Sequence, residues 1–415
     1  MEEWKEYKLG EVCTISSSKR IFASEYQKTG IPFYRGREII EKHSGIAISN
    51  ELFISEEKYD EIKNKYGVPK EGDMLLSSVG TLGVPYIVKN ETFYFKDGNL
   101  TWFYNYKGIN NYFLYYWFLS PKARFLIDSK AIGSTQKALT IDTLKKFDIF
   151  LPAIDTQDKI VSILSSLDDK IELNRKINAN LEAQAQALFK SWFVDFEPFK
   201  DQPFVESELG MIPEGWRVGE IGDYCNIRSG FAFKSSWWSD NGIKVIKIKN
   251  ITEDGRIDIS DCSFVSKEHA MLAKEFQTKV GDLLIAMTGA TIGKFCIIPT
   301  DTPMCVNQRV GKFFLGDKPL EKLPFIYYNL KRPNIFEEIV RKGQGSAQPN
   351  ISGKDIESIK LVFPPDSIIS RFNQSAIIYI KRGILNEQES RRLASLRDAL
   401  LSRLMSGELK VNEVI

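Results

Sequence analysis

The sequence predicts an α+β protein built as a pseudo-two-fold tandem repeat. Two similar domains of mixed helices and strands are joined by two long antiparallel coiled-coil helices. Three observations lead to this prediction. Similar segments recur at one fixed spacing, each repeat opens with short strand-like runs between turns, and each repeat ends in a long segment with a helical apolar stripe.

Composition supports several folded domains and excludes a uniformly basic surface. The chain has 415 residues, of which 43% are hydrophobic, and 56 Lys+Arg balance 54 Asp+Glu to a net charge of +2. Domains of about 100–200 residues would therefore number two to four. Because the charge is balanced, any contact with nucleic acid must come from local basic patches.

The cysteines and histidines predict neither disulfides nor a metal site. Five cysteines are scattered without a C-x-x-C pair, which favours reduced thiols and a cytoplasmic location. Two histidines without paired cysteines make a zinc site unexpected. The start of the chain is charged, unlike a signal peptide, and the apolar run Tyr112–Leu119 is too short to cross a membrane.

The repeat has a spacing of 212 residues, which separates Trp4 from Trp216 and Gly133–Gln136 from Gly345–Gln348. Because one spacing recurs over well-separated blocks, a duplicated domain explains it better than chance similarity. The predicted parts are a first domain over residues 1–152, a long helix over 153–197, a linker over 198–213, a second domain over 214–364 and a second long helix over 365–415.

The first long helix is predicted by apolar residues that alternate at spacings of three and four from Ile160 to Trp192, without Gly or Pro. Some 40 residues at about 1.5 Å rise make a rod of about 60 Å, too long to be covered by one small domain. The duplicated segment supplies a partner rod, so we expect antiparallel pairing. The alternative is that each helix packs on its own domain.

Two features of these helices have candidate roles. Asn174 and Asn386 occupy equivalent stripe positions, and a buried Asn in a helical seam fixes register, although both could instead face solvent. Four apolar residues near the end of the first helix cover more than one of its faces, which makes them a candidate surface for docking a partner. They could instead pack on a globular domain. These four residues are Leu188, Phe189, Trp192 and Phe193.

No motif for catalysis stands out. The nearest approach to a phosphate-binding P-loop, Gly289–Phe295, has too short a spacer and a Phe where a hydroxyl belongs. His43 and His269 each stand alone in a polar stretch without an adjacent nucleophile. We therefore expect a recognition or scaffold protein with no catalytic residue, rather than an enzyme.

Three segments give the chain its family resemblance: Leu151–Asn174, Phe189–Phe199 and Ser207–Trp216. Together with the duplicated layout, they resemble the specificity subunit of type I restriction–modification systems over essentially the whole chain. The segment Phe363–Ala376, which leads into the second long helix, is a degenerate copy of the corresponding segment of the first helix. The two helices therefore depart from strict symmetry.

The resemblance implies a non-catalytic subunit with two target-recognition domains, each reading one half of a bipartite site on double-stranded DNA. The helices would fix the spacer between the half-sites. Two methyltransferase subunits and translocase–nuclease subunits would be the partners. Those partners would use S-adenosylmethionine, ATP and Mg²⁺, so no cofactor is expected in this chain, and no membrane contact.

Basic and amide side chains in turn-rich places are the candidate DNA contacts, because Arg, Lys, Asn and Gln read base edges and phosphates. In the first domain they are Lys19, Arg20, Arg35, Arg37, Gln136 and Lys137. In the second they are Arg228, Lys234, Lys247, Lys249, Arg309, Arg341, Lys342 and Gln348. The aromatic blocks Phe113–Phe118 and Phe325–Tyr328 have helical spacing, which predicts core rather than base stacking.

Two other classes of protein stay open from sequence alone. A coiled-coil scaffold that binds only proteins would use the globular parts as docking modules. A self-contained nuclease or methyltransferase would need catalytic motifs, and the sequence does not supply them.

Overall fold

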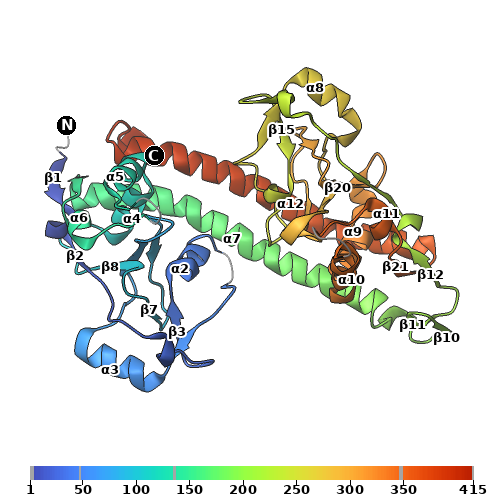
Figure 1. Cartoon of the computed structure of the whole chain (residues 1–415), viewed down its shortest axis with the longest axis horizontal. Coiled ribbons are helices and arrows are strands. Elements are labelled where there is room, and N and C mark those ends of the chain that lie inside the picture. The colour runs from blue at the N-terminus through green and yellow to red at the C-terminus, as the bar shows by residue number, and fades with distance from the viewer. Residues whose placement is uncertain (1–3, 46–47, 134–136, 345–348, 414–415) are drawn as a thin grey trace. The chain divides into compact units, whose positions relative to one another are not determined.

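The computed structural model describes the whole chain except residues 1–3, 46–47, 134–136, 345–348 and 414–415. Two compact units divide the described chain. Unit 1 comprises Met1–Glu172 and Arg392–Ile415, and unit 2 comprises Leu173–Arg391. Each unit therefore contains one globular part and a portion of both long helices (Figure 1). The five-part division expected from the sequence, with helices separate from domains, stays a prediction.

Unit 1 is built on a four-stranded sheet of order β2-β8-β5-β6. A smaller sheet of order β4-β3-β7 and an antiparallel pair β1-β9 complete its strands. The strands are β1 (Lys5–Lys8), β2 (Thr14–Ser16), β3 (Ile31–Tyr34), β4 (Phe53–Ile54), β5 (Met74–Ser77), β6 (Pro85–Ile87), β7 (Tyr94–Phe95), β8 (Leu100–Tyr104) and β9 (Asp148–Leu151). The short helices are α1 (Leu9–Val12), α2 (Gly36–His43), α3 (Glu56–Tyr66), α4 (Asn111–Leu119), α5 (Pro121–Lys130) and α6 (Ile141–Lys145).

Unit 2 repeats this topology, with sheets of order β13-β20-β17-β18 and β14-β16-β15-β19 and the pair β12-β21. Strand β14 corresponds in unit 1 to a single antiparallel bridge, between Gln27 and Phe53. The strands are β12 (Arg217–Glu220), β13 (Asn226–Ser229), β14 (Trp238–Ser239), β15 (Ile243–Ile246), β16 (Ser263–Val265), β17 (Leu283–Ala286), β18 (Phe295–Ile297), β19 (Cys305–Val306), β20 (Val310–Phe314) and β21 (Lys360–Phe363). The short helices are α8 (Lys267–Leu272), α9 (Pro319–Leu330), α10 (Pro333–Gly343) and α11 (Gly353–Glu357). The matching strand orders confirm the predicted duplication.

The aromatic blocks form buried helices, as their spacing predicts. Helix α4 begins after Asn110, whose side chain accepts hydrogen bonds from the N–H groups of Tyr112 and Phe113. Phe113 and Phe118 are fully buried, as is Phe325 on α9. These aromatics fill the main apolar core of each unit, so they are unavailable for stacking on bases.

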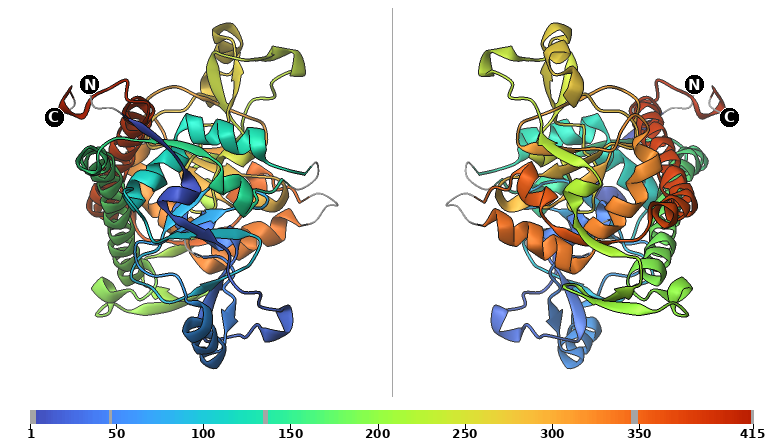
Figure 2. Two further views of the ribbon diagram at one scale, coloured as in Figure 1. Left: turned by 90° about the vertical axis from the view of Figure 1, so that its left-hand side faces the viewer. Right: turned by 90° about the vertical axis from the view of Figure 1, so that its right-hand side faces the viewer.

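The two long helices are α7 (Ile154–Phe193) and α12 (Asp366–Met405), each of 40 residues. In unit 1 the early turns of α7 pack on the last turns of α12, through Leu164 and Leu404. Arg397 Nη1 of α12 donates to Asp168 Oδ1 of α7 at 2.6 Å. The end-on views of Figure 2 show the two ribbons side by side.

In unit 2 the late turns of α7 pack on the early turns of α12. The rings of Phe193 and Phe372 lie 4.8 Å apart between centroids. Since the start of α7 meets the end of α12 and the end of α7 meets its start, the pairing is antiparallel. The alternative, in which each helix packs only on its own domain, is therefore wrong.

Helix α7 ends at Phe193, before the predicted limit at residue 197. Phe196 adopts a left-handed backbone conformation at φ 52°, and Pro198 follows, so the chain turns sharply. Phe196 then packs on Trp216, with 5.4 Å between ring centroids. Aromatic packing, rather than helix propensity, sets this end.

The segment expected to be a linker over residues 198–213 contains regular structure. Strands β10 (Phe204–Ser207) and β11 (Gly210–Pro213) pair as an antiparallel hairpin. Gly210 at φ 100° supplies the positive φ that the tight turn requires. The Gly and Pro in this segment therefore mark a hairpin turn and a strand end, not an irregular linker.

Candidate nucleic-acid interface

In unit 1, three segments meet at one edge of the main sheet. Beyond the end of β5, Ser78 N–H donates to the carbonyl of Asn99, just before β8, at 2.8 Å. Leu139 N–H donates to the carbonyl of Ser78 at 2.9 Å, and Gly80 N–H donates to the carbonyl of Lys137 at 3.2 Å. These bonds hold the loops together, and we call residues 78–80, 97–99 and 137–139 the loop edge of unit 1.

Unit 2 builds the same edge with the same three bonds. Met287 N–H donates to the carbonyl of Arg309 at 3.0 Å, and Ile351 N–H donates to the carbonyl of Met287 at 2.9 Å. Gly289 N–H donates to the carbonyl of Pro349 at 2.9 Å. Residues 287–289, 307–309 and 349–351 form the loop edge of unit 2. A rigid sheet that presents loops at its strand ends is a common way to place binding residues.

Four of the predicted DNA contacts lie at these edges. Lys137 belongs to the unit 1 edge and Arg309 to the unit 2 edge, and both side chains are exposed. Arg20 Nε is bonded to Asp97 Oδ2 of the unit 1 edge at 2.9 Å, and the ammonium of its neighbour Lys19 lies 4.5 Å from the ring centroid of Tyr66. Gln136 and Gln348 lie outside the described residues.

Arg35 and Arg37 lie at the start of α2 and are bound to acidic partners. The guanidinium of Arg35 pairs with Glu38, which is 1% exposed, and Glu38 also accepts from the Arg35 N–H. Arg37 bonds to Glu41 at 3.0 Å. Arg35 is thus part of a helix cap, and its charge is already neutralised by a buried carboxylate. Sequence spacing marked a basic cluster here but could not reveal these pairs.

In unit 2 two predicted cations are held by acidic residues that are distant in sequence. The guanidinium of Arg228 pairs with Glu275 and lies 3.9 Å from the ring centroid of Phe314. Lys249 pairs with Asp261. These ion pairs are exposed, so each contributes little to stability and can exchange for a phosphate.

Of the other unit 2 cations, three lie against hydroxyls or aromatic rings and Arg341 lies near a carboxylate. Lys247 Nζ bonds to Ser263 Oγ at 2.7 Å and lies 4.0 Å from the ring centroid of Trp238. Partial burial, and then the neighbouring charge of Lys249, lower the pKa of Lys247. Lys234 lies 5.3 Å from the ring centroid of Trp237. On and beside α10, Arg341 is 3.7 Å from Glu338, and Lys342 bonds to Ser358 at 3.1 Å.

The sequence predicted a docking surface at the end of α7. For its two phenylalanines this prediction is wrong, because both side chains are buried. Phe189 and Phe193 are only 4% and 5% exposed. Both pack on Phe372 within the unit 2 core, and Leu188 and Trp192 pack against the same cluster. The residues cover more than one face because α7 is wedged between α12 and the globular part. A partner has no access to these two rings.

Asn174 and Asn386 both lie in the seam between α7 and α12, and each is 1% exposed. Asn174 Nδ2 donates to Glu389 Oε2 at 2.8 Å, and Asn386 Nδ2 donates to Asn178 Oδ1 at 2.7 Å. The predicted burial of both residues is confirmed. Asn178 is a third member of this polar layer that the sequence pattern did not single out.

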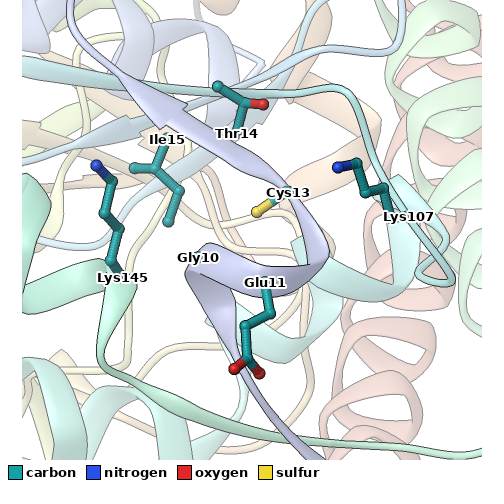
Figure 3. A pocket seen from close by; sticks show the side chains of 7 residues that line it. All are labelled: Gly10, Glu11, Cys13, Thr14, Ile15, Lys107 and Lys145. Carbon is teal, nitrogen blue, oxygen red and sulfur yellow. The ribbon is translucent and has the colours of Figure 1, made fainter.

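Figure 3 shows a small polar pocket in unit 1, with Lys107 and Lys145 on opposite sides of Cys13. Burial raises the pKa of the Cys13 thiol to about 12, so it is not a thiolate nucleophile at neutral pH. Glu11 accepts the N–H of Lys8 at 2.8 Å and serves as a helix cap.

The histidines and acidic residues do not assemble into a reactive centre either. His43 is more buried than its polar surroundings in the sequence indicate, and burial lowers its pKa. Its Nδ1 lies 2.8 Å from the carbonyl of Pro85. His269 stacks on Trp237, with 4.3 Å between ring centroids. Among the described residues, no three His, Cys, Asp or Glu side chains are grouped to hold a metal ion.

Both units therefore present the same loop edge on a sheet of the same strand order. The chain matches the model of the type I restriction modification DNA specificity domain over residues 1–183 and 213–389. The chain belongs to this family of specificity subunits, which recognise DNA and are not themselves enzymes.

Two similar proteins are specificity subunits from Methanocaldococcus jannaschii and Haemophilus influenzae. The type I restriction enzyme MjaIX specificity subunit of Methanocaldococcus jannaschii is 30% identical over 318 residues, which cover 74% of this chain and 71% of the relative. The HindI specificity subunit of Haemophilus influenzae is 24% identical over 492 residues and covers 99% of this chain and all of its own length.

A solved structure supports the same fold. The crystal structure of the type I restriction–modification S subunit from M. genitalium superposes with a TM-score of 0.57 at 17% identity, and covers 97% of this chain and 96% of its own.

Within the described residues, no helix is long and apolar enough to span a membrane.

Proposed function

We propose that this chain reads a bipartite site on double-stranded DNA, with the loop edge of each unit reading one half-site. The observation that carries the proposal is the repetition of one edge, closed by the same three backbone hydrogen bonds, in both units. Two copies of one recognition device on a single chain suit a ligand that offers two separated sites. Family membership makes DNA that ligand.

The charges at the two edges favour contact with a duplex. Lys19, Lys137 and Arg309 are exposed cations on or beside these loops. Phosphate contacts position a protein on DNA, and base contacts supply its specificity. Each phosphate that is neutralised contributes about −0.9 to the slope of log K against log salt concentration. The net charge of only +2 leaves little positive charge beyond these patches, so binding by this chain alone should be weak and its salt slope shallow.

The paired helices would set the spacer between the half-sites and carry the partner subunits. Two methyltransferase subunits, and then translocase–nuclease subunits, would supply the chemistry with S-adenosylmethionine, ATP and Mg²⁺. Ile378 and Leu385 of α12 are 61% and 56% exposed and lie two helical turns apart, so they share one face. This face, which also carries the exposed Lys381 and Arg382, replaces the buried end of α7 as the candidate docking surface for a methyltransferase.

The test is binding of duplexes by the full chain together with its methyltransferase. Sequencing the methylated bases in cells that carry both subunits first identifies the site. Binding is then measured for the intact site, for duplexes with either half scrambled, and for a control with only the spacer scrambled. We expect either scrambled half to reduce affinity to the non-specific level, a loss of about 10³-fold or more. The scrambled spacer should bind like the intact site.

Equal binding to all four duplexes would contradict the proposal. Co-purification of the methyltransferase without any dependence on DNA sequence would instead favour a scaffold that binds only proteins. Methylation or cleavage by this chain alone would identify an enzyme.

A further inference from the structure

Asn99 of unit 1 and Arg309 of unit 2 occupy equivalent positions in the loop edge. Each is the last residue before the central strand of its sheet, β8 or β20. Each accepts, through its backbone carbonyl, the N–H of the first residue after the neighbouring strand, with N···O distances of 2.8 Å for Ser78 and 3.0 Å for Met287. The two side chains are therefore carried by the same rigid frame.

The hydrogen-bonding groups of both side chains are unused within the described part of the chain. Arg309 is exposed, and its guanidinium has no hydrogen-bond or ion-pair partner among the described residues. The arginines Arg20 and Arg228, in contrast, are held by Asp97 and Glu275. Asn99 is partly exposed, and its carboxamide likewise has no partner among the described residues. A side chain that reads a base needs free donors and acceptors, and within the described part of the chain these two side chains have them.

The chemistry of the two side chains differs in a way that predicts different bases. An arginine donates two hydrogen bonds to O6 and N7 of guanine in the major groove, whereas asparagine donates to N7 and accepts from N6 of adenine. On the proposed DNA-reading function, we propose that Asn99 and Arg309 are equivalent specificity-determining residues. Arg309 reads a guanine in one half-site, and Asn99 reads an adenine in the other.

The positions of these residues favour base contacts over phosphate contacts. The Arg309 N–H is 3.4 Å from Asn307 Oδ1, and Val310, the next residue, accepts the N–H of Gly230 at 2.9 Å. The Arg309 backbone is thus fixed on both sides. A fixed backbone holds the start of the side chain, its Cα–Cβ bond, in one direction, which suits the reading of a single base more than general attraction to phosphates.

The experiment uses the full chain with its methyltransferase and duplexes that carry every single-base change in the site. The variants are Arg309→Gln and Asn99→Ala. Matched controls are Arg256→Gln in unit 2, where Arg256 pairs with Asp254, and Asn90→Ala in unit 1, where Asn90 is exposed at a turn after β6. Thermal unfolding of each variant checks that it remains folded.

We expect Arg309→Gln to lose discrimination at one guanine of one half-site by about 5- to 150-fold, with the preference moving toward adenine. Asn99→Ala should flatten the preference at one adenine of the other half-site by a similar factor. Both controls should keep the wild-type pattern.

Three results would overturn the inference. Unchanged base preferences in both variants would show that neither side chain reads a base. A uniform loss of affinity over all sequences would assign the residues to phosphates. Changes in the same half-site for both variants would contradict their equivalence. If the wild-type complex showed no sequence preference at all, the proposed DNA-reading function itself would fail.

Discussion

Asn386 of α12 donates a side-chain N–H to Asn178 Oδ1 of α7 at 2.7 Å, inside the seam between the two helices. Asn178 Nδ2 in turn donates to the carbonyl of Gly383 at 3.1 Å. Asn386 is buried and Asn178 is partly buried, and amides in a seam that satisfy one another only in one alignment favour that alignment over a shifted one. Gly383 of α12 therefore lies beside this polar layer.

This layer predicts a coupling between Asn178 and Asn386. Either single change to Ala leaves the other amide short of a partner and should lower the free energy of unfolding by about 1–3 kcal/mol. The double variant should lose less than the sum, because both partners are then gone. Chemical denaturation of the three variants measures the coupling, with exposed Asn180→Ala as control. Additive losses would mean that the contact carries no energy.

The apolar part of the seam gives a second prediction. Leu164 of α7 is fully buried in unit 1, whereas Leu173 on the same helix is 49% exposed. Leu164→Asp places a charge in an apolar core and should destabilise unit 1 by about 3 kcal/mol or more. Leu173→Asp should melt near the wild-type temperature. Equal melting of the two variants in calorimetry would contradict the observed pairing.

A substitution at the end of α7 should lower stability, whereas substitutions at exposed positions of α12 should weaken only the docking of a partner. Phe193→Ala removes a core ring and should lower the free energy of unfolding by about 3–5 kcal/mol. Ile378→Glu with Leu385→Glu alters only exposed positions, so it should leave stability nearly unchanged but weaken co-purification with the methyltransferase. Melting curves measure the stability of each variant, and pull-down of the same preparations measures its binding to the methyltransferase. An intact complex in the double variant would rule out this face as the docking surface.

A buried ion pair distinguishes the two units. Lys312 Nζ lies 2.7 Å from Asp282 Oδ2, and the two side chains are 7% and 2% exposed. At the equivalent place in unit 1, Trp102 Nε1 donates to Asp73 Oδ2 at 2.9 Å. Lys312→Met strands a buried carboxylate and should destabilise unit 2 by about 3–5 kcal/mol. Lys318→Met, at an exposed pair with Glu321, is the control and should change the unfolding midpoint little. Equal unfolding midpoints for the two variants would mean that the buried pair of Lys312 and Asp282 does not stabilise unit 2.

Short-range patterns made the helices and the duplication predictable. The three-and-four spacing from Ile160 onward depends only on local periodicity, and α7 and α12 follow it for 40 residues each. The antiparallel pairing was expected from the length of the helices and from the duplication, because only a second rod could cover such a stripe and the repeat supplies one. The buried Asn174 and Asn386 were found by their positions on that stripe.

Contacts between distant residues limited the prediction of the site. Glu275 neutralises Arg228 from 47 positions away, and no local pattern indicates that pair. The burial of Phe193 depends on Phe372, Phe325 and Trp216, which come from three separate segments. Asn99 was missed because a single asparagine in a turn carries no local signal. Only the shared backbone bonds of the two edges reveal it as the counterpart of Arg309.

The most direct test of the account exchanges one recognition domain. Residues 214–364 are replaced by the corresponding segment of a relative that methylates a different site, and the chimera is expressed with its methyltransferase. Sequencing the methylated bases should show one half of the site replaced, the other half unchanged and the spacer length kept. A site altered in both halves, or an altered spacer with both halves intact, would contradict the claim that each unit reads its own half-site.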